Sequence, residues 1–240
     1  MSFPRRKERR LWLSAIYRLS RLPFASGRMK LRVFLDAEWF FARAAHEQFT
    51  RLVPPEENPF KLDQARFLSG SIPPGATILD LGCGYGHLAA YLSKTAGRVV
   101  AVDHNEEVLA QASRLHEQKG LEFRVGSAQA FLETEVEGFD VLVLSHVLEH
   151  LDDPGSFLAR FVSRFRFVFI EVPDFDHSYL NLYREHFGVE DAYTDEDHIS
   201  EFGREELREL VEGAGLAILR REYRVGVQRL WCEVLESDKA

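Results

Sequence analysis

Cysteine is scarce in this 240-residue chain, which has two such residues, Cys83 and Cys232. They stand in unlike sequence contexts and make no metal-ligand spacing, so the sequence indicates a reducing compartment. Long apolar runs are also missing: no stretch reaches the roughly eighteen residues that a membrane span needs, and no signal-peptide cleavage pattern follows the N-terminus. We therefore expect a cytoplasmic protein that does not cross a membrane.

Two phosphate-binding motifs are missing from the stretch at residues 77–86, which reads TILDLGCGYG. A dinucleotide motif would need its third glycine at His87, and a P-loop would need a Gly-Lys-Ser/Thr ending. Instead, an apolar run, an acid and three alternating glycines predict a strand and a tight turn before a helix from His87 to Lys94. Asp80 would repel a pyrophosphate but attract a sulfonium or ammonium charge, so the turn suits S-adenosylmethionine.

Charge is distributed unevenly along the chain. The net charge is -8, but residues 1–32 carry ten Lys/Arg and one acid, which makes this end +9 and the remainder -17. Residues 9–19 have the spacing of a basic amphipathic helix, and we expect residues 5–21 to contact an anionic lipid surface, at the inner face of a membrane. A solvated helix on its own domain and a disordered basic tail stay open as alternatives.

A helical cap is expected ahead of the main domain. Apolar residues at helical spacing predict a helix over residues 30–49, with a stripe that favours a core position or a lid over the substrate. A short helix over residues 62–69 follows, among several prolines. We assign residues 1–73 to the arm and cap and residues 74–240 to the cofactor-binding domain. The stripe comprises Val33, Phe34, Ala37, Phe40, Phe41, Ala44 and Ala45.

Buried strands alternate with helices through the rest of the chain. Asp103 ends the second strand, about twenty residues beyond the first glycine, where a carboxylate can accept hydrogen bonds from both ribose hydroxyls. Residues 174–199 have little periodicity and are expected to form an insertion on the substrate side of the sheet. Further strands are predicted at residues 98–103, 121–125, 139–145, 165–172, 216–223 and 227–235, and further helices at 105–119, from 154, and at 204–214.

Two segments resemble the class I S-adenosylmethionine-dependent methyltransferases of types 11 and 23. Residues 80–86 have the form Asp-x-Gly-x-Gly-x-Gly, and residues 146–154 read HVLEHLDDP after the fourth strand. The resemblance implies a Rossmann-like three-layer α/β sandwich, whose seven-stranded, mostly parallel sheet has an antiparallel last strand. It further implies an O-methyltransferase that moves a methyl group from S-adenosylmethionine to a small-molecule, glycan, quinone-type or lipid-linked acceptor.

His146 and His198 are the candidate catalytic residues. His146 comes first after the fourth strand, and His198 stands where similar enzymes bring a loop residue over the acceptor. An unperturbed imidazole titrates near neutral pH, with a pKa of about 6.5, and suits proton transfer. Ser127 replaces the acid that often meets the adenine amino group. The expected cofactor-binding residues are Asp80, Gly82, Cys83, Gly84, Gly86, Asp103, His104, Ser127, Ala128 and His146.

Three alternatives stay open beside this hypothesis. No metal is expected, although His146, Glu149 and His150 could share one helical face and, with His198, bind a divalent cation. The chain could also be a methyltransferase-like module without catalysis. A nucleic-acid methyltransferase is disfavoured, because the body is acidic and no known RNA-binding module is present.

Overall fold

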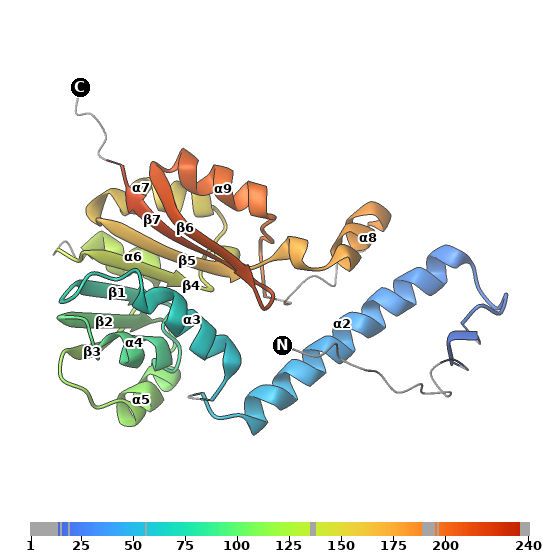
Figure 1. Ribbon diagram of the computed structural model, residues 1–240, viewed down its shortest axis with the longest axis horizontal. Helices are drawn as coiled ribbons and strands as arrows, with labels where there is room; N and C mark the ends of the chain where they lie inside the picture. Colours follow the sequence, from blue (N-terminus) through green and yellow to red (C-terminus); the bar gives the residue numbers. More distant parts are fainter. Residues whose placement is uncertain are drawn as a thin grey trace, which may run out of the picture.

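A seven-stranded sheet forms the centre of the molecule (Figure 1). The computed structural model describes residues 14, 16–18, 20–55, 57–134, 138–188, 195 and 197–235. The strand order is β3-β2-β1-β4-β5-β7-β6, and β7 runs antiparallel to both of its neighbours. The strands are β1 Thr77–Leu81, β2 Arg98–Asp103, β3 Leu121–Val125, β4 Val141–Ser145, β5 Phe167–Pro173, β6 Leu216–Arg224 and β7 Val227–Val234.

Helices cover both faces of this sheet. One apolar cluster joins the sheet to α6, α7 and α9, and a second joins it to α3 and α4. The helices are α2 Gly27–Leu52, α3 Pro59–Ser69, α4 His87–Leu92, α5 Glu106–Leu115, α6 Ala128–Thr134, α7 Pro154–Phe161, α8 Tyr179–Phe187 and α9 Arg204–Gly213. Short 3-10 turns occupy η1 Leu148–His150, η2 Val162–Arg164 and η3 Phe175–His177. The layered fold that the resemblance implied is therefore confirmed.

The central strands are buried on both sides because they are made almost entirely of apolar residues. The whole of β5 and nearly all of β1, β2 and β4 are inaccessible to solvent, as expected where helices cover both faces of a parallel sheet. β1 pairs in parallel with β2 on one side and β4 on the other. β2 and β3 therefore lie on one side of β1, and β4 and β5 lie on the other. Open α/β folds bind ligands at the carboxyl ends of the strands where the strand order reverses in this way.

The segment at residues 174–199 contains a helix that the sequence pattern did not predict. Ser178 caps α8 by accepting a hydrogen bond from the Leu180 amide, and Gly188 ends it in the left-handed conformation, with φ 61°. Both are ordinary helix boundary signals. Aromatic and charged residues are mixed along this nine-residue helix. The spacing of its apolar residues therefore did not indicate a helix.

The aromatic stripe of α2 lies on the outside of the molecule and not in a core. Leu35 is the buried residue of this 26-residue helix, whereas Val33, Phe34, Phe40 and Phe41 are exposed. Figure 1 shows α2 extending away from the sheet, with α8 beside it. The expectation of a core position for this stripe is wrong. In the part of the chain that the structure describes, no helix has the length and apolarity needed to cross a membrane.

Candidate active site

The glycine turn after β1 has a backbone that side chains would obstruct. Gly82, Gly84 and Gly86 have φ values of 71°, 52° and 72°, a region that residues with a Cβ rarely adopt. A Cβ on Gly86 would lie 2.6 Å from the Phe123 ring, and one on Gly82 would lie 2.9 Å from Val147. Glycine at these two positions therefore lets the turn pack against Phe123 and Val147, whereas a Cβ on Gly84 would meet nothing within 4 Å and leaves that position open.

Two carboxylates flank this turn. Asp103 accepts hydrogen bonds from the Gly84 amide to Oδ2 at 2.8 Å and from the Asn105 amide to Oδ1 at 2.9 Å. Asp80 is 1 % exposed, and its Oδ2 has no hydrogen-bond partner among the described residues. Burial raises the pKa of Asp80 to about 7, against the opposing charge of Lys61 and with a smaller contribution from Asp103.

The turn and its acids fit S-adenosylmethionine. The unpartnered oxygen of Asp80 can receive a cationic ligand, and the fixed Asp103 carboxylate retains lone pairs for ribose hydroxyls. A ligand that carries a positive charge would lower the pKa of Asp80 and keep it ionised. A pyrophosphate at this turn would be repelled by the carboxylates of Asp80 and Asp103. Among the described residues near Asp80, Lys61 is the cation that could offset this repulsion.

The other expected cofactor residues surround the same edge of the sheet. Cys83 is half-buried within the turn, and burial raises the pKa of its thiol well above the usual range, so the thiol stays neutral. His104 is exposed beside Asp103. Ser127 accepts a hydrogen bond from the Ala130 amide at 3.2 Å, so its hydroxyl caps α6. Adenine contacts by Ser127 and Ala128 stay predictions.

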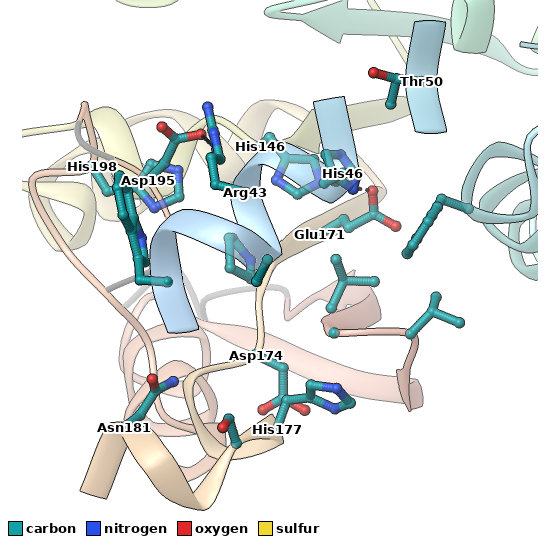
Figure 2. Close-up of a pocket in the computed structure, with 18 of the residues that line it drawn as sticks. Arg43, His46, Thr50, His146, Glu171, Asp174, His177, Asn181, Asp195 and His198 are labelled. Atoms are coloured by element: carbon teal, nitrogen blue, oxygen red, sulfur yellow. Dashed lines mark hydrogen bonds and ion pairs between the residues drawn. The ribbon is translucent and has the colours of Figure 1, made fainter. Parts of the chain in front are cut away.

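A cavity of about 570 Å³ lies at the carboxyl ends of β4 and β5. α2 and α8 wall it on one side, and α3 and the β6–β7 turn wall it on the other. Figure 2 shows His146, Glu171 and His46 on one part of the lining and Asp174, His177 and Asn181 on another. Apolar side chains complete the wall, namely Trp39, Ala42, Phe60, Pro173, Val225 and Val227. Apolar surface with a few polar groups is typical of small-molecule sites.

His146 faces this cavity from a backbone conformation that is rare for a residue with a side chain, with φ 56°. Its Nδ1 lies 3.0 Å from Glu149 Oε1, and its Nε2 lies 3.4 Å from Glu171 Oε1. Desolvation disfavours the charged ring, but the two carboxylates outweigh this effect and raise its pKa to about 9. His146 therefore carries a proton at neutral pH. A left-handed residue held between two acids is the kind of strained position that often marks a functional site.

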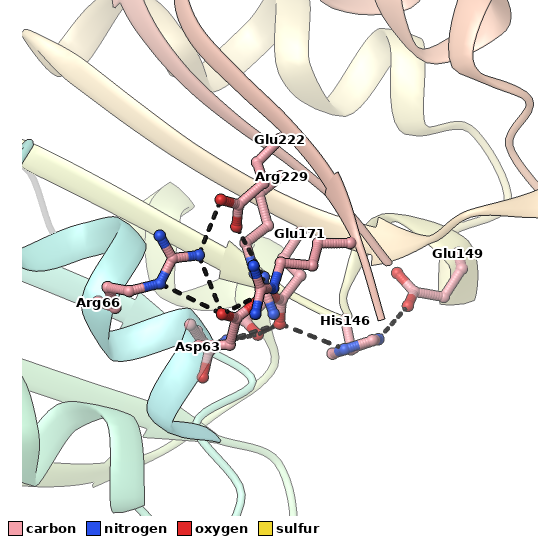
Figure 3. A network of polar contacts seen from close by, with 10 residues as sticks. Asp63, Arg66, His146, Glu149, Glu171, Glu222 and Arg229 are labelled. Atoms are coloured by element: carbon pink, nitrogen blue, oxygen red, sulfur yellow. Dashed lines mark hydrogen bonds and ion pairs between the residues drawn. The ribbon is translucent and has the colours of Figure 1, made fainter. Parts of the chain in front are cut away.

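Glu171 belongs to a buried network of charges that crosses four elements (Figure 3). Arg229 on β7, 1 % exposed, donates hydrogen bonds to Glu171, to Asp63 at 2.9 Å and to Glu222 at 3.1 Å. Gln64 on α3 donates to the same Glu171 carboxylate at 2.6 Å. Burial would raise the pKa of Glu171, but the His146 and Arg229 cations lower it to about 2.

The structure brings His198 to the cavity with His146. The His198 ring packs edge-on against His150 at 5.0 Å, and its Nδ1 lies 3.0 Å from Glu201, a contact that raises its pKa despite desolvation. Ligand atoms of Glu149, His150 and His198 lie within 4.8 Å of one another. Three members of the alternative metal set are therefore together, while both ring nitrogens of the fourth, His146, face carboxylates.

Several lining residues escaped the sequence reasoning. Glu171 is a charge within an otherwise apolar strand and Arg229 directly precedes the apolar residues 230–232, and such charges are rarely buried without a partner. That anomaly was a signal for a buried pair. Lys61 follows Pro59 on α3 and influences Asp80 from outside the glycine turn, which no motif indicated.

A family model described as a methyltransferase domain matches residues 56–221. The ubiquinone biosynthesis O-methyltransferase of Hahella chejuensis is 35% identical over 108 residues, which cover 43% of this chain and 44% of that protein. The enzyme of that name from Hydrogenovibrio crunogenus is 30% identical over 168 residues, covering 62% of this chain and 69% of that protein. The chain thus spans less than half the length of the first relative.

Solved structures share the fold at low identity. Magnesium protoporphyrin IX methyltransferase from Synechocystis, with S-adenosylhomocysteine bound, matches with a TM-score of 0.53 and 14% identity over 93% of this chain and 94% of that one. Mitomycin 7-O-methyltransferase matches with a TM-score of 0.55 and 21% identity over 73% of this chain and 54% of that one. At these identities the likeness concerns the architecture alone.

Proposed function

This chain belongs to the methyltransferase domain family, and we propose that it methylates a hydroxyl oxygen of a small-molecule acceptor, of the phenolic or quinol class. It is an S-adenosylmethionine-dependent methyltransferase. The observation that carries the acceptor proposal is the cavity at the carboxyl ends of β4 and β5, with His146 held between Glu149 and Glu171 at its wall. The two relatives named for ubiquinone biosynthesis support the same class.

The cofactor site would be formed by the glycine turn, Asp80 and Asp103. When bound, S-adenosylmethionine supplies a methyl group made electrophilic by its sulfonium centre. Lys61 is a cation near Asp80 and would pair with the carboxylate of the cofactor's methionine part. These groups act by fixing the position of the reactants, which supplies much of the rate in such transfers.

His146 is proposed as the proton acceptor for the hydroxyl group. Its conjugate acid has a pKa of about 9, close to the value of about 10 for a phenol, so the proton transfer is nearly balanced. An alcohol of a sugar is a much weaker acid and would be served less well. His146 must first lose its own proton to solvent. Nδ1 would then keep its contact with Glu149, while Nε2, at 3.4 Å from Glu171, would turn to the hydroxyl group and accept its proton. His198 would contact the acceptor from the opposite loop.

A divalent metal is the alternative for activating the hydroxyl group. Glu149 Oε2 is buried without a hydrogen-bond partner among the described residues, close to His150 and His198. Elemental analysis and activity after chelation would separate the two mechanisms. Retained activity without bound metal supports the histidine base.

The basic arm at residues 5–21 remains a proposed contact with an anionic membrane surface. Residues 5–13, 15 and 19 lie outside the described residues, so the contact expected there has no structural test. A glycan or lipid-linked acceptor and a nucleic-acid acceptor are the other outcomes that an acceptor screen would reveal.

The decisive experiment supplies the full chain with methyl-labelled S-adenosylmethionine and three acceptor sets: catechols and quinols, sugars and lipid-linked glycans, and RNA. Label transferred to a catechol or quinol oxygen is the expected result, with the product identified by mass spectrometry. His146→Gln serves as the comparison, because it should reduce turnover at least 100-fold while S-adenosylhomocysteine still binds. Label in the sugar or RNA set alone would overturn the proposed acceptor class.

A further inference from the structure

α2 has two apolar faces, and the sheet domain uses one of them. The inner face carries the buried Leu35 and supplies Trp39, Ala42 and His46 to the cavity wall. The opposite face carries four large apolar side chains that stay in solvent. Val33 is 54 % exposed, Phe34 48 %, Phe40 59 % and Phe41 68 %.

The exposed apolar surface continues before the helix begins. Ile16, Tyr17, Leu22, Phe24 and Met29 are all more than half exposed. Figure 1 shows this part of the chain at the end of α2 that lies farthest from the sheet. Scattered apolar residues are normal on a protein surface, but a continuous band along one helix usually marks a contact with another apolar phase.

Cations accompany the first part of this band, before Asp36 and Glu38 follow on α2. Between residues 14 and 35 the sequence has Arg18, Arg21, Arg28, Lys30 and Arg32 and no Asp or Glu. Arg21, Arg28 and Lys30 contact hydroxyl, carbonyl and aromatic groups in the described chain, and none of these three meets a carboxylate there. Within the described part of the chain, these three charges are therefore not paired with an acid.

We propose that the band formed by these exposed apolar side chains, from Ile16 to Phe41, docks on a membrane surface that contains anionic lipid. Aromatic and aliphatic side chains would enter the interface while the neighbouring cations meet lipid headgroups. The charge of the chain favours an orientation in which Arg28 and Lys30 at the start of α2 meet the anionic surface, because most of the acids lie beyond the band. A second copy is a poorer occupant, since two bands aligned in parallel would bring Arg28 and Lys30 of one chain near the same cations of the other.

Docking through this band would place the bilayer next to the acceptor cavity. Only the thickness of α2 separates the band from the lining residues Trp39, Ala42 and His46. A lipid-soluble phenol or quinol could then enter beside α2 without crossing water. This consequence rests on the proposed function, whereas the docking itself does not.

Vesicle flotation with the full chain tests the docking. The chain should float with vesicles of phosphatidylcholine and phosphatidylglycerol at low salt, and at least tenfold less with phosphatidylcholine alone. The double variant Phe40→Ser/Phe41→Ser should lower the partition onto anionic vesicles at least tenfold. Leu115→Ser/Leu219→Ser is the matched control, because these side chains are 61 % and 54 % exposed on α5 and β6, and it should float like the unaltered chain.

Three results would overturn docking. The first is no flotation with anionic vesicles, and the second is equal loss in both double variants. The third is sedimentation showing a dimer that Phe40→Ser/Phe41→Ser converts to a monomer, which would assign the band to a second copy. S-adenosylhomocysteine binding and methylation of a water-soluble catechol should be unchanged in both variants. Failure of that methylation in the unaltered chain would count against the proposed acceptor and leave the docking result intact.

Discussion

Asp103 is the residue on which cofactor affinity should depend most. Its carboxylate is fixed by the amides of Gly84 and Asn105, so it is already oriented for the ribose before the cofactor arrives. Asp103→Asn keeps the size of the side chain but removes the charge and one acceptor. We expect S-adenosylhomocysteine to bind about 10- to 100-fold more weakly by calorimetry, since a hydrogen bond to a charged group contributes about 1.5–3 kcal/mol.

His104→Ala provides the comparison for this measurement. That neighbouring ring is exposed and lies 3.6 Å from the same carboxylate. It should change the dissociation constant less than threefold. Equal losses in the two variants would show that Asp103 acts through the shape of the loop and not through the ribose.

Glu171 should set the pH at which His146 becomes a base. The Glu171 and Glu149 carboxylates together raise the pKa of His146 from 6.5 to about 9, so kcat/KM should climb with pH until about pH 9. In Glu171→Gln one of these charges is gone, and the acid limb of the profile should move at least one pH unit lower. The pH dependence of kcat/KM over pH 6–10 measures this shift.

Glu222→Gln separates this electrostatic effect from a loss of structure. Glu222 accepts from the same Arg229 but makes no contact with His146 among those described. Its profile should keep the apparent pKa near 9 even if the chain is less stable. An unmoved profile in Glu171→Gln would exclude His146 as the titrating base.

At the residue scale the sequence identified the cofactor side of the site better than the acceptor side. Asp80, the three glycines and Asp103 follow one another closely along two strand ends, so local spacing was enough to find them. The burial of the Glu171 carboxylate depends on its pairing with Arg229, which lies 58 residues further along the chain. No local pattern records a pairing of that range.

Among the elements, the turn from β1 to α4 tolerates substitution least. Gly86→Ala would combine a φ of 72° with a contact of 2.6 Å to Phe123, so we expect a loss of roughly 2–4 kcal/mol in the free energy of unfolding. Urea unfolding measures it. Gly213→Ala, at the end of α9 with no atom within 4 Å of the new Cβ, should be neutral or slightly stabilising. Similar losses in the two variants would contradict this account of the turn.

The strands and most helices could be predicted because their signals are local. The strands over residues 98–103 and 121–125 were predicted with the bounds that the structure has, and those at 139–145, 165–172, 216–223 and 227–235 differ at one or both ends by one or two residues. The helix α6 at Ala128–Thr134 was not predicted, and two further failures have a common cause. α8 and the outer face of α2 belong to helices whose apolar residues do not mark the sheet side, so periodicity indicated neither the helix at residues 179–187 nor the side on which α2 packs.

The stability of the whole molecule should fall as the pH rises from about 6 to about 9. The folded-state pKa values of Asp80 and His146 are both raised, to about 7 and about 9. A raised pKa contributes stability that is present below the unfolded value and is lost as the pH passes the folded value. Glu171 has a lowered pKa, and its contribution is lost only in acid, below about pH 4.5.

Urea unfolding at pH 6, 7.5 and 9 tests this expectation on the chain without cofactor. Asp80→Asn should flatten the part of the decline below pH 7, because the amide does not titrate. Bound S-adenosylhomocysteine should favour the ionised Asp80. The decline in the free energy of unfolding below pH 7 should then be smaller. Stability that rises between pH 6 and pH 9 would show that neither group is protonated as described.

β7 gives the site an order of assembly. It is the last strand along the chain, yet it lies inside the sheet between β5 and β6 and carries Arg229. A ribosome therefore releases Glu171 well before the cation that neutralises it. Until β7 arrives, the cofactor turn can form, but Glu171 on β5 would have His146 and Gln64 beside it without the Arg229 cation. A newly made chain should thus form the glycine turn after β1 early and the cavity at the ends of β4 and β5 last. Methyl transfer should therefore begin only after β7 has been synthesised.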